Sequence, residues 1–196
     1  MFHDISPAIL ERMAYMEAVD ARDRLDGTPT AYRLRQIPPE TGRFLALLAA
    51  SSPRGAVLEI GTSGGYSSLW LALACRQRGD RLITFEAAAN KVSLAQETFR
   101  LAQVQDLVQV VQGDATQLLP RYSAVAFCFI DIEKDTYRPS YDLLLPILVR
   151  GGIFCADNAI SHARELAPFL EYVASDTRVD SLVVPVGKGV LVCRKV

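Results

Sequence analysis

The sequence predicts an α/β fold in which a mostly parallel sheet is covered by helices on both faces. After residue 54, short apolar runs alternate with stretches that have helical spacing, which is typical of successive strand–helix units. The run Ala124–Ile130 has no polar face, as expected of a central parallel strand. Two further apolar runs flank Gly187-Lys188-Gly189 and predict a C-terminal antiparallel hairpin, which brings the expected total to seven strands.

Each element follows from a local pattern. A helix is expected from Ser6-Pro7 to about residue 26, because Ser caps and Pro fits the first turn, then a proline-containing loop and a helix over Glu40–Ser51. Four later helices are expected. The first two run from the glycine-rich loop to about Arg76 and over Asn90–Ala102, the third includes Leu148 and is broken by Gly151-Gly152, and the last covers Ala163–Ser175. The strands are expected at Ala56–Ile60, Arg81–Phe85, Val108–Gln112, Ala124–Ile130, Ile153–Ala156, Leu182–Val186 and Val190–Arg194, with one antiparallel strand at a sheet edge. We expect one domain, with N-terminal helices over 1–52 and an α/β core over 53–196.

Composition excludes several classes of protein. The chain has 196 residues with 21 basic and 22 acidic side chains, so it lacks the basic excess of a nucleic-acid binder. The longest apolar run is seven residues, whereas a membrane span needs about 20. The N-terminus does not resemble a secretory signal. We therefore expect a cytoplasmic globular protein that partners neither nucleic acid nor membrane, and whose four cysteines, each in an apolar stretch, are reduced core residues.

Carboxylates follow the predicted parallel strands. They are spaced by 27, 28, 17 and 26 residues, close to one strand–helix unit each, and are Glu59, Glu86, Asp114, Asp131 and Asp157. Ligands bind outside the carboxyl ends of the strands in open parallel sheets. Helix capping explains any single acid here but is a poor explanation for all five, so the pattern predicts a ligand site along this edge.

The loop after the first strand narrows the choice of ligand. Residues Gly61 to Gly65 let a ligand approach the backbone and lead into a helix, but they lack the G-x-G-x-x-G dinucleotide pattern. Glu59, just before the glycines, suits a cationic group such as an amine better than a pyrophosphate. Glu86, at the end of the next strand, is placed to accept two ribose hydroxyls. An amino acid joined to a ribose describes S-adenosylmethionine.

Five motifs resemble those of one enzyme family. They are V-L-E-I-G-T-S-G-G-Y-S (57–67), I-T-F-E (83–86), G-D-A (113–115), F-I-D-I-E-K-D-T-Y (129–137) and A-D-N-A-I (156–160). Over about residues 35–196 the chain is similar to the class I S-adenosylmethionine-dependent O-methyltransferases, specifically the small bacterial members of the catechol and caffeoyl-CoA group. The first motif indicates only the superfamily, while D-x-x-K-D-x-Y with D-N is much more specific. The resemblance implies a Rossmann-like, doubly wound sheet.

The resemblance also implies roles for individual residues. Lys134 would be the general base, Asp131 would join it in catalysis, and Asp131, Asp157 and Asn158 would hold a divalent metal. The cofactor would contact Glu59, Gly61, Thr62, Ser63, Gly65, Tyr66, Ser67, Glu86, Gly113, Asp114, Ala115 and Asp131. Tyr66 and Ser67 would meet its methionine end, Glu86 its ribose, and Asp114 and Ala115 its adenine.

These residue types suit metal-assisted methyl transfer on chemical grounds as well. Two carboxylates and an amide oxygen form a hard site for Mg²⁺ above all, and also for Mn²⁺ or Ca²⁺. A catechol-like or phenolic acceptor would bind the ion through its hydroxyls, and Lys134, kept neutral by the nearby metal charge, would take the proton. The oxygen would then attack the sulfonium methyl in line, with much of the acceleration coming from positioning.

Alternatives remain at this point. The chain also fits a metal-independent methyltransferase that uses S-adenosylmethionine on another small molecule, and a nucleotide-binding oxidoreductase or sensor module. Asp157-Asn158 would in that case only turn the chain. The segment after Asn158 is short, so the acceptor site is expected to be open or completed by the N-terminal segment or a partner subunit. Arg33 and Arg35 are candidates for steering an anionic acceptor, and the resemblance favours a homodimer.

Overall fold

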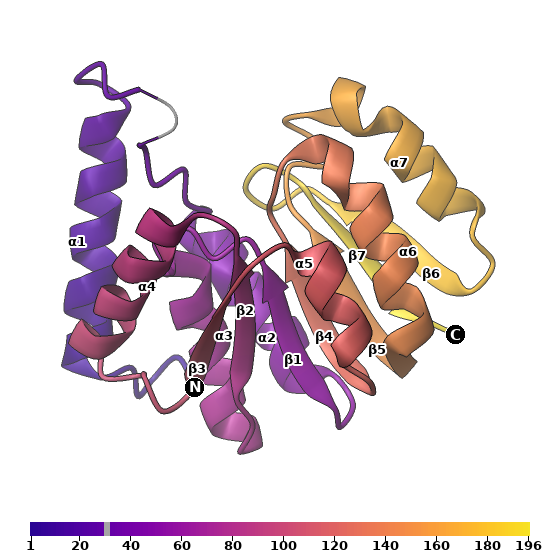
Figure 1. The fold of residues 1–196 in the computed structure, drawn as a ribbon, viewed down its shortest axis with the longest axis horizontal. Helices are drawn as coiled ribbons and strands as arrows, with labels where there is room; N and C mark the ends of the chain where they lie inside the picture. The colour runs from indigo at the N-terminus through magenta and orange to yellow at the C-terminus, as the bar shows by residue number, and fades with distance from the viewer. Residues whose placement is uncertain (30–31) are drawn as a thin grey trace.

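The computed structural model describes residues 1–29 and 32–196 and contains a seven-stranded sheet between two layers of helices (Figure 1). The order of the strands is β3-β2-β1-β4-β5-β7-β6. Neighbours from β3 to β5 are parallel, and β7 is antiparallel to both β5 and β6. The strands are β1 (Ala56–Ile60), β2 (Leu82–Glu86), β3 (Val108–Gln112), β4 (Val125–Ile130), β5 (Leu148–Ala156), β6 (Val179–Val184) and β7 (Val190–Lys195). The predicted α/β class, with its C-terminal antiparallel hairpin, is confirmed.

The helices divide between the two faces of the sheet. One face packs against α2, α3 and α4, with α1 lying outside α3 and α4, and the other packs against α5, α6 and α7 (Figure 1). The helices are α1 (Pro7–Asp23), α2 (Pro39–Ser51), α3 (Tyr66–Arg78), α4 (Ala89–Leu101), α5 (Ala115–Leu118), α6 (Tyr137–Ile147) and α7 (Ala163–Ser175), with short 3₁₀ turns η1 (Leu119–Arg121) and η2 (Lys134–Thr136).

Strand β4 shows why the sheet is buried on both faces. All six of its residues are buried. Phe127 and Phe129 point to the side of α1–α4, whereas Cys128 and Ile130 point to the side of α5–α7, because side chains alternate along a strand. A strand without a polar face is therefore stable only at the centre of the sheet.

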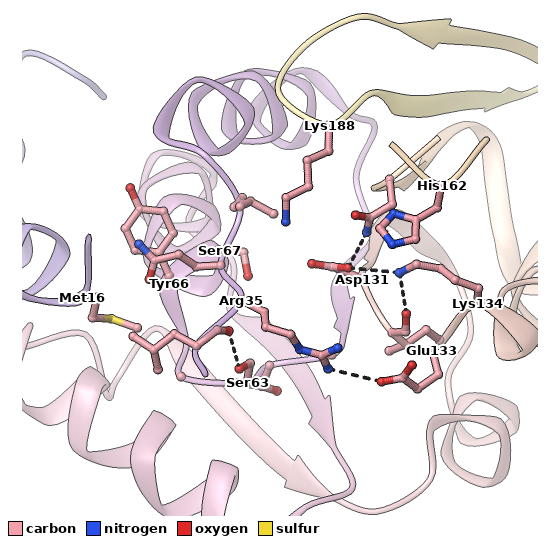
Figure 2. A pocket seen from close by; sticks show the side chains of 18 of the residues that line it. Met16, Arg35, Ser63, Tyr66, Ser67, Asp131, Glu133, Lys134, His162 and Lys188 are labelled. Atoms are coloured by element: carbon pink, nitrogen blue, oxygen red, sulfur yellow. Dashed lines mark hydrogen bonds and ion pairs between the residues drawn. The ribbon is translucent and has the colours of Figure 1, made fainter. Parts of the chain in front are cut away.

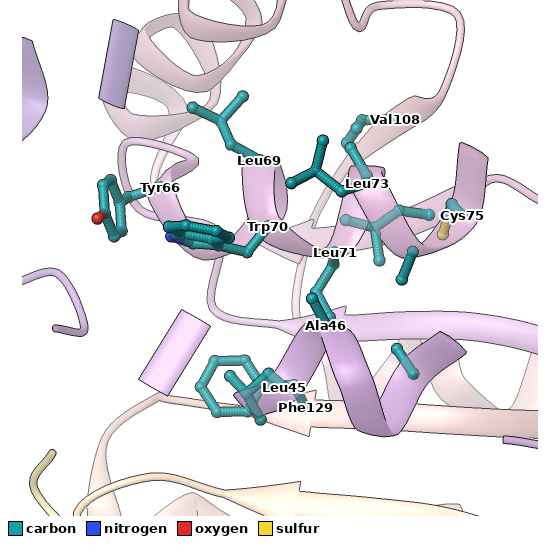
Figure 3. Close-up of a cluster of buried hydrophobic side chains, with 14 of the residues drawn as sticks. Leu45, Ala46, Tyr66, Leu69, Trp70, Leu71, Leu73, Cys75, Val108 and Phe129 are labelled. Carbon is teal, nitrogen blue, oxygen red and sulfur yellow. The ribbon is translucent and has the colours of Figure 1, made fainter. Parts of the chain in front are cut away.

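The core on the first face is built around α2 and α3. Leu45 and Ala46 of α2 pack near Leu71 of α3, and Trp70 lies beside them (Figure 3). Trp70 is 3% exposed, and the ring of Phe2 meets it edge-on with 6.0 Å between the centroids, so Trp70 is part of this core. All four cysteines are free and buried, as predicted.

The structure corrects two expectations about the C-terminal half. The helix expected to include Leu148 ends at Ile147, one residue after Pro146, which cannot donate to the helix, and Gly151-Gly152 lie inside β5 instead. The register there jumps from Val125↔Leu148 to Phe127↔Ile153, so the two glycines fall in a bulge. The antiparallel strand is not at the edge either, because β7 lies between β5 and β6.

Two further observations concern the limits of the described chain and its helices. Residues 30 and 31 belong to the predicted proline-containing loop and lie outside the described residues, which leaves the loop prediction untested at these two positions.

Among the described residues, no helix combines the length and the apolar character needed to cross a membrane.

The packing of α2 gives a matched pair of stability predictions. Leu45 is fully buried, whereas Leu47 on the same helix is 51% exposed. Leu45→Ala should lower the free energy of unfolding by about 2–5 kcal/mol through the cavity it leaves, and Leu47→Ala should change it by about 0.5 kcal/mol or less. Urea denaturation measures both, and equal losses would contradict the assigned burial.

Candidate active site

Two cavities adjoin at the carboxyl ends of β1, β2 and β4. Their volumes are about 330 Å³ and about 520 Å³. Because they share part of their walls, we describe them as the first and second lobes of one cleft, and Figure 2 shows the first lobe. The shared residues are Arg35, Gly61, Ser63, Asp131, Ile132 and Glu133.

The glycine-rich loop between β1 and α3 forms the floor between the lobes. Gly61 has a φ of +98°, and a Cβ there would lie 2.3 Å from the carbonyl oxygen of Asp131, so only glycine fits. The backbone N–H of Ser63 donates to Glu86 Oε2 at 2.8 Å, and the Ser63 hydroxyl donates to the carbonyl of Leu34 at 3.1 Å. These bonds hold the loop to β2 and to the chain after α1.

Glu86 occupies the wall of the second lobe with both oxygens hydrogen-bonded to backbone. Besides Ser63, the N–H of Ala88 donates to Oε1 at 3.0 Å, which leaves further lone pairs on each oxygen for a ligand. Gly113, Asp114 and Ala115 line the same lobe. Asp114 also caps α5 through Thr116, so for this acid the capping role and the position at the cleft coexist.

Glu59 corrects the prediction that every strand-end carboxylate faces the ligand. Its side chain is fully buried and lines neither lobe. The hydroxyl of Ser68 and that of Thr84, the latter at 2.7 Å, donate to its Oε2, and among the described residues Oε1 has no partner. Burial raises the pKa of Glu59 to about 7. Glu59 therefore connects α3 and β2 beneath the loop, outside both lobes of the cleft.

Asp131 and Lys134 point toward each other in the first lobe (Figure 2), and Asn158 lines the same lobe. Asn158 Nδ2 donates to Asp131 Oδ1 at 2.8 Å, and Lys134 Nζ lies 3.8 Å from the same oxygen. Lys134 also donates to the carbonyl of Ile132 at 2.9 Å and to the hydroxyl of Tyr137 at 3.2 Å. The ammonium group is thus held in one place, with only 13% of the side chain exposed.

Asp157 lies directly behind this group. It is fully buried, and within the described part of the chain neither carboxylate oxygen has a hydrogen-bond partner. Burial, together with the neighbouring charge of Asp131, raises the pKa of Asp157 to about 6. A buried carboxylate without a hydrogen-bond partner is costly, and a bound cation would offset that cost.

The donor set fits a hard divalent cation. Asp131 and Asp157 would supply carboxylate oxygens, and Asn158, whose Nδ2 faces Asp131 in this structure, would supply its amide oxygen once the amide is turned over. Among the described residues, no three His, Cys, Asp or Glu side chains gather into a metal-binding group. The amide and solvent would therefore have to complete the coordination, which is acceptable for Mg²⁺ because it retains several waters.

Most of the sequence-predicted residues lie in the cleft. The first lobe contains Gly61, Thr62, Ser63, Tyr66, Ser67, Asp131, Lys134 and Asn158. Glu59, Gly65 and Asp157 line neither lobe. Gly65 instead caps the N-terminus of α3, with a φ of +90°.

Several residues that line the cleft are not predicted from the sequence. The chain between α1 and α2 contributes Leu34, Gln36 and Ile37 to the first lobe, and the β6–β7 hairpin contributes Lys188. Lys91 and Ser140 line the second lobe. None of these residues lies at the end of a parallel strand, so the sequence pattern does not point to them. Only the Gly-Lys-Gly turn could have indicated Lys188, as a residue held at a hairpin tip.

Comparison with known proteins decides the family. The family model described as "O-methyltransferase" matches residues 27–196, which is most of the chain. The chain belongs to this O-methyltransferase family.

Individual relatives agree with the assignment. A catechol O-methyltransferase from Mycobacterium tuberculosis is 34% identical over 126 residues, covering 63% of this chain and 57% of that protein, so the match spans little more than half of the relative. A caffeoyl-CoA O-methyltransferase from Populus kitakamiensis is 27% identical, covering 81% of this chain and 77% of that protein. The solved O-methyltransferase from Bacillus cereus, in complex with SAH, superimposes with a TM-score of 0.78 at 25% identity, covering 95% and 91% of the two chains.

The burial of Glu59 in this O-methyltransferase family member predicts a pH effect. The folded state binds more protons than the unfolded state between pH 4.5, the ordinary pKa of this carboxyl, and about 7. Stability should therefore fall as the pH rises through this window. Glu59→Gln should remove about 1–3 kcal/mol of that fall, as measured by urea denaturation at pH 4.5 and pH 8. The exposed Glu97→Gln is the control, and an unchanged pH dependence in Glu59→Gln would refute the assignment.

Proposed function

We propose that this chain transfers a methyl group from S-adenosylmethionine to a hydroxyl oxygen of a small, catechol-like or phenolic acceptor, assisted by a divalent cation. The observation that carries the proposal is a single cleft that joins Glu86 in one lobe to Asp131, Lys134 and Asn158 in the other, with the unsatisfied Asp157 behind them. Membership of the O-methyltransferase family supports it.

The second lobe suits the nucleoside part of the cofactor. Glu86 would accept the two ribose hydroxyls, while Gly113, Asp114 and Ala115 would border the adenine. Tyr66 and Ser67, in the first lobe, would meet the methionine end. The cofactor supplies a methyl group on a sulfonium, and the chain would orient it toward the lobe that contains Lys134.

The cation would be held by Asp131, Asp157 and Asn158. When bound, it supplies positive charge that acidifies and orients a coordinated hydroxyl group. Oxygen ligands favour Mg²⁺, and also admit Mn²⁺ or Ca²⁺. The two carboxylates directly follow neighbouring strands, and burial, together with the charge of Asp131, raises the pKa of Asp157.

Lys134 would accept the proton of the acceptor hydroxyl. The carbonyl of Ile132 and the hydroxyl of Tyr137 hold Nζ beside Asp131, so the amine is positioned before the acceptor binds. The bond from the acceptor oxygen to the methyl carbon would form as the carbon–sulfur bond breaks, and the proton would pass from Lys134 to solvent. The walls of the cleft would align the two reactants.

Two further parts of the proposal concern the whole protein. We propose a cytoplasmic location and a homodimer, for which the exposed apolar side chains of α1 and the following turn, Leu10, Tyr15 and Leu25, offer a surface.

The alternative function is metal-independent transfer of the methyl group to another small molecule. Family membership argues against an oxidoreductase or sensor module.

The metal site is tested by Asp157→Asn. We expect wild-type methyl transfer from labelled S-adenosylmethionine to catechol to stop with chelator and return with Mg²⁺, and the variant to lose about a hundredfold or more in kcat/KM. Because a buried charge is removed, the metal-free variant should be at least as stable as the wild type. Calorimetry with Mg²⁺ alone should show weaker binding, while the exposed Asp135→Asn behaves as wild type. Methyl transfer that continues in the presence of the chelator would contradict the metal assignment, but it would still support methyl transfer as the reaction.

The general base is tested by Lys134→Met. The expected loss in kcat is about 10²–10⁴-fold, with the affinity for S-adenosylhomocysteine nearly unchanged, since Lys134 is not among the residues proposed to contact the cofactor. Lys134→Arg should not restore activity, because a guanidinium does not release its proton. The matched control is Arg138→Met, an exposed cation on the next turn. A Lys134→Met variant with normal kcat and an unaltered pH–rate profile would rule out this role.

A further inference from the structure

Lys188 enters the first lobe from the tip of the β6–β7 hairpin (Figure 2). Its backbone carbonyl accepts hydrogen bonds from the N–H groups of Ile160 and Ser161 at 3.1 Å and 2.9 Å, and the carbonyl of Gly189 accepts one from Ala159 at 2.9 Å. The hairpin tip is therefore fixed to the segment that follows Asp157-Asn158. The backbone makes all of these contacts, so they survive a change of the Lys188 side chain.

The neighbouring glycine explains how closely the tip approaches that segment. Gly189 has a φ of +87°, and a Cβ there would lie 2.4 Å from the Ile160 side chain. Only glycine permits this approach. The Cα of Lys188 is consequently held at a set distance from the cleft, and its flexible side chain spans the remaining gap toward the centre of the lobe.

The charges in the first lobe leave Lys188 without a side-chain partner. Arg35 pairs with Glu133 at 3.2 Å, and Lys134 approaches Asp131 at 3.8 Å. Within the described ranges, no hydrogen bond or ion pair is formed by the Lys188 ammonium, although its charge, like that of Lys134, opposes the rise in the pKa of Asp157. A cation bound to Asp157 would take over that role and leave the half-buried ammonium available for a ligand anion.

We propose that Lys188 determines acceptor specificity by binding a carboxylate on the acceptor. This inference rests on the proposed function and narrows its substrate class to small phenols that carry both a vicinal diol and a carboxylate. An ammonium group pairs with a carboxylate through a charge-assisted hydrogen bond. A first lobe of about 330 Å³, which the acceptor would share with the methionine end of the cofactor, lies at the lower end of ligand-site volumes and favours a small, one-ring acid.

The test compares acceptors that differ in charge. Steady-state kinetics with Mg²⁺ would use 3,4-dihydroxybenzoate and neutral catechol on the wild type, Lys188→Met and Lys188→Arg. We expect the ratio of kcat/KM for the acid to kcat/KM for catechol to fall about tenfold to a hundredfold in Lys188→Met, mainly through KM, and Lys188→Arg to recover most of it. Arg164→Met, which removes an exposed cation near the cleft, should leave the ratio unchanged. An unchanged ratio in Lys188→Met would overturn the proposal.

Two further experiments identify the anion that Lys188 binds and test this inference independently of the proposed methyl transfer. Caffeate and its coenzyme A thioester place the negative charge on a carboxylate and on remote phosphates, respectively, and a greater loss for the thioester would overturn the carboxylate assignment. Calorimetric binding of 3,4-dimethoxybenzoate, which has no free hydroxyl, needs no methyl transfer. With S-adenosylhomocysteine present, it should bind the wild type more tightly than Lys188→Met, and equal affinities would overturn the proposal even if methyl transfer is confirmed.

Discussion

The arrangement of the cleft depends on hydrogen bonds that extend the parallel sheet beyond the ends of its strands. The N–H of Gly61 donates to the carbonyl of Phe85 at 3.0 Å, that of Asp131 to Ile60 at 3.0 Å, and that of Asp157 to Ile130 at 3.1 Å. Each bond places the first residue of a loop in register with the neighbouring strand. Asp131 and Asp157 are adjacent for this reason, before any side chain contributes.

The same geometry forces carboxylates into a poorly solvated position, and the chain compensates for them unequally. Glu59 receives two hydroxyl donors, so its burial is partly offset from within the fold. Asp157 receives none among the described residues. One oxygen of Glu59 is thus satisfied within the fold, whereas neither oxygen of Asp157 is, and this difference supports the proposal that Asp157 binds a cation.

The sequence predicts the fold well because the strands on both sides of the cleft are apolar and the turns carry glycine. It predicts the site less completely, and Glu59 shows why. Glu59 is the penultimate residue of β1 and shares its face with Val57, so the two-residue period of a strand turns it toward α3. Asp131 and Asp157 follow their strands, so the alternation of side chains along a strand does not fix which way they point. Position relative to the strand end, rather than residue type, separates the two outcomes.

Residues contributed by distant segments lie beyond what strand-end patterns can reveal. Leu34 and Lys188 reach the first lobe from opposite ends of the chain, because the segment after α1 is tied to Ser63 and the hairpin tip is tied to the loop after β5. These two contacts close the lobe over the strand ends. The carboxylates at the strand ends make the edge of the sheet acidic, and Arg35, Lys134 and Lys188 then add a cation from each of three separate segments. The first lobe is therefore lined by side chains of both charges, so the cation and the anionic acceptor proposed above would stabilise each other there.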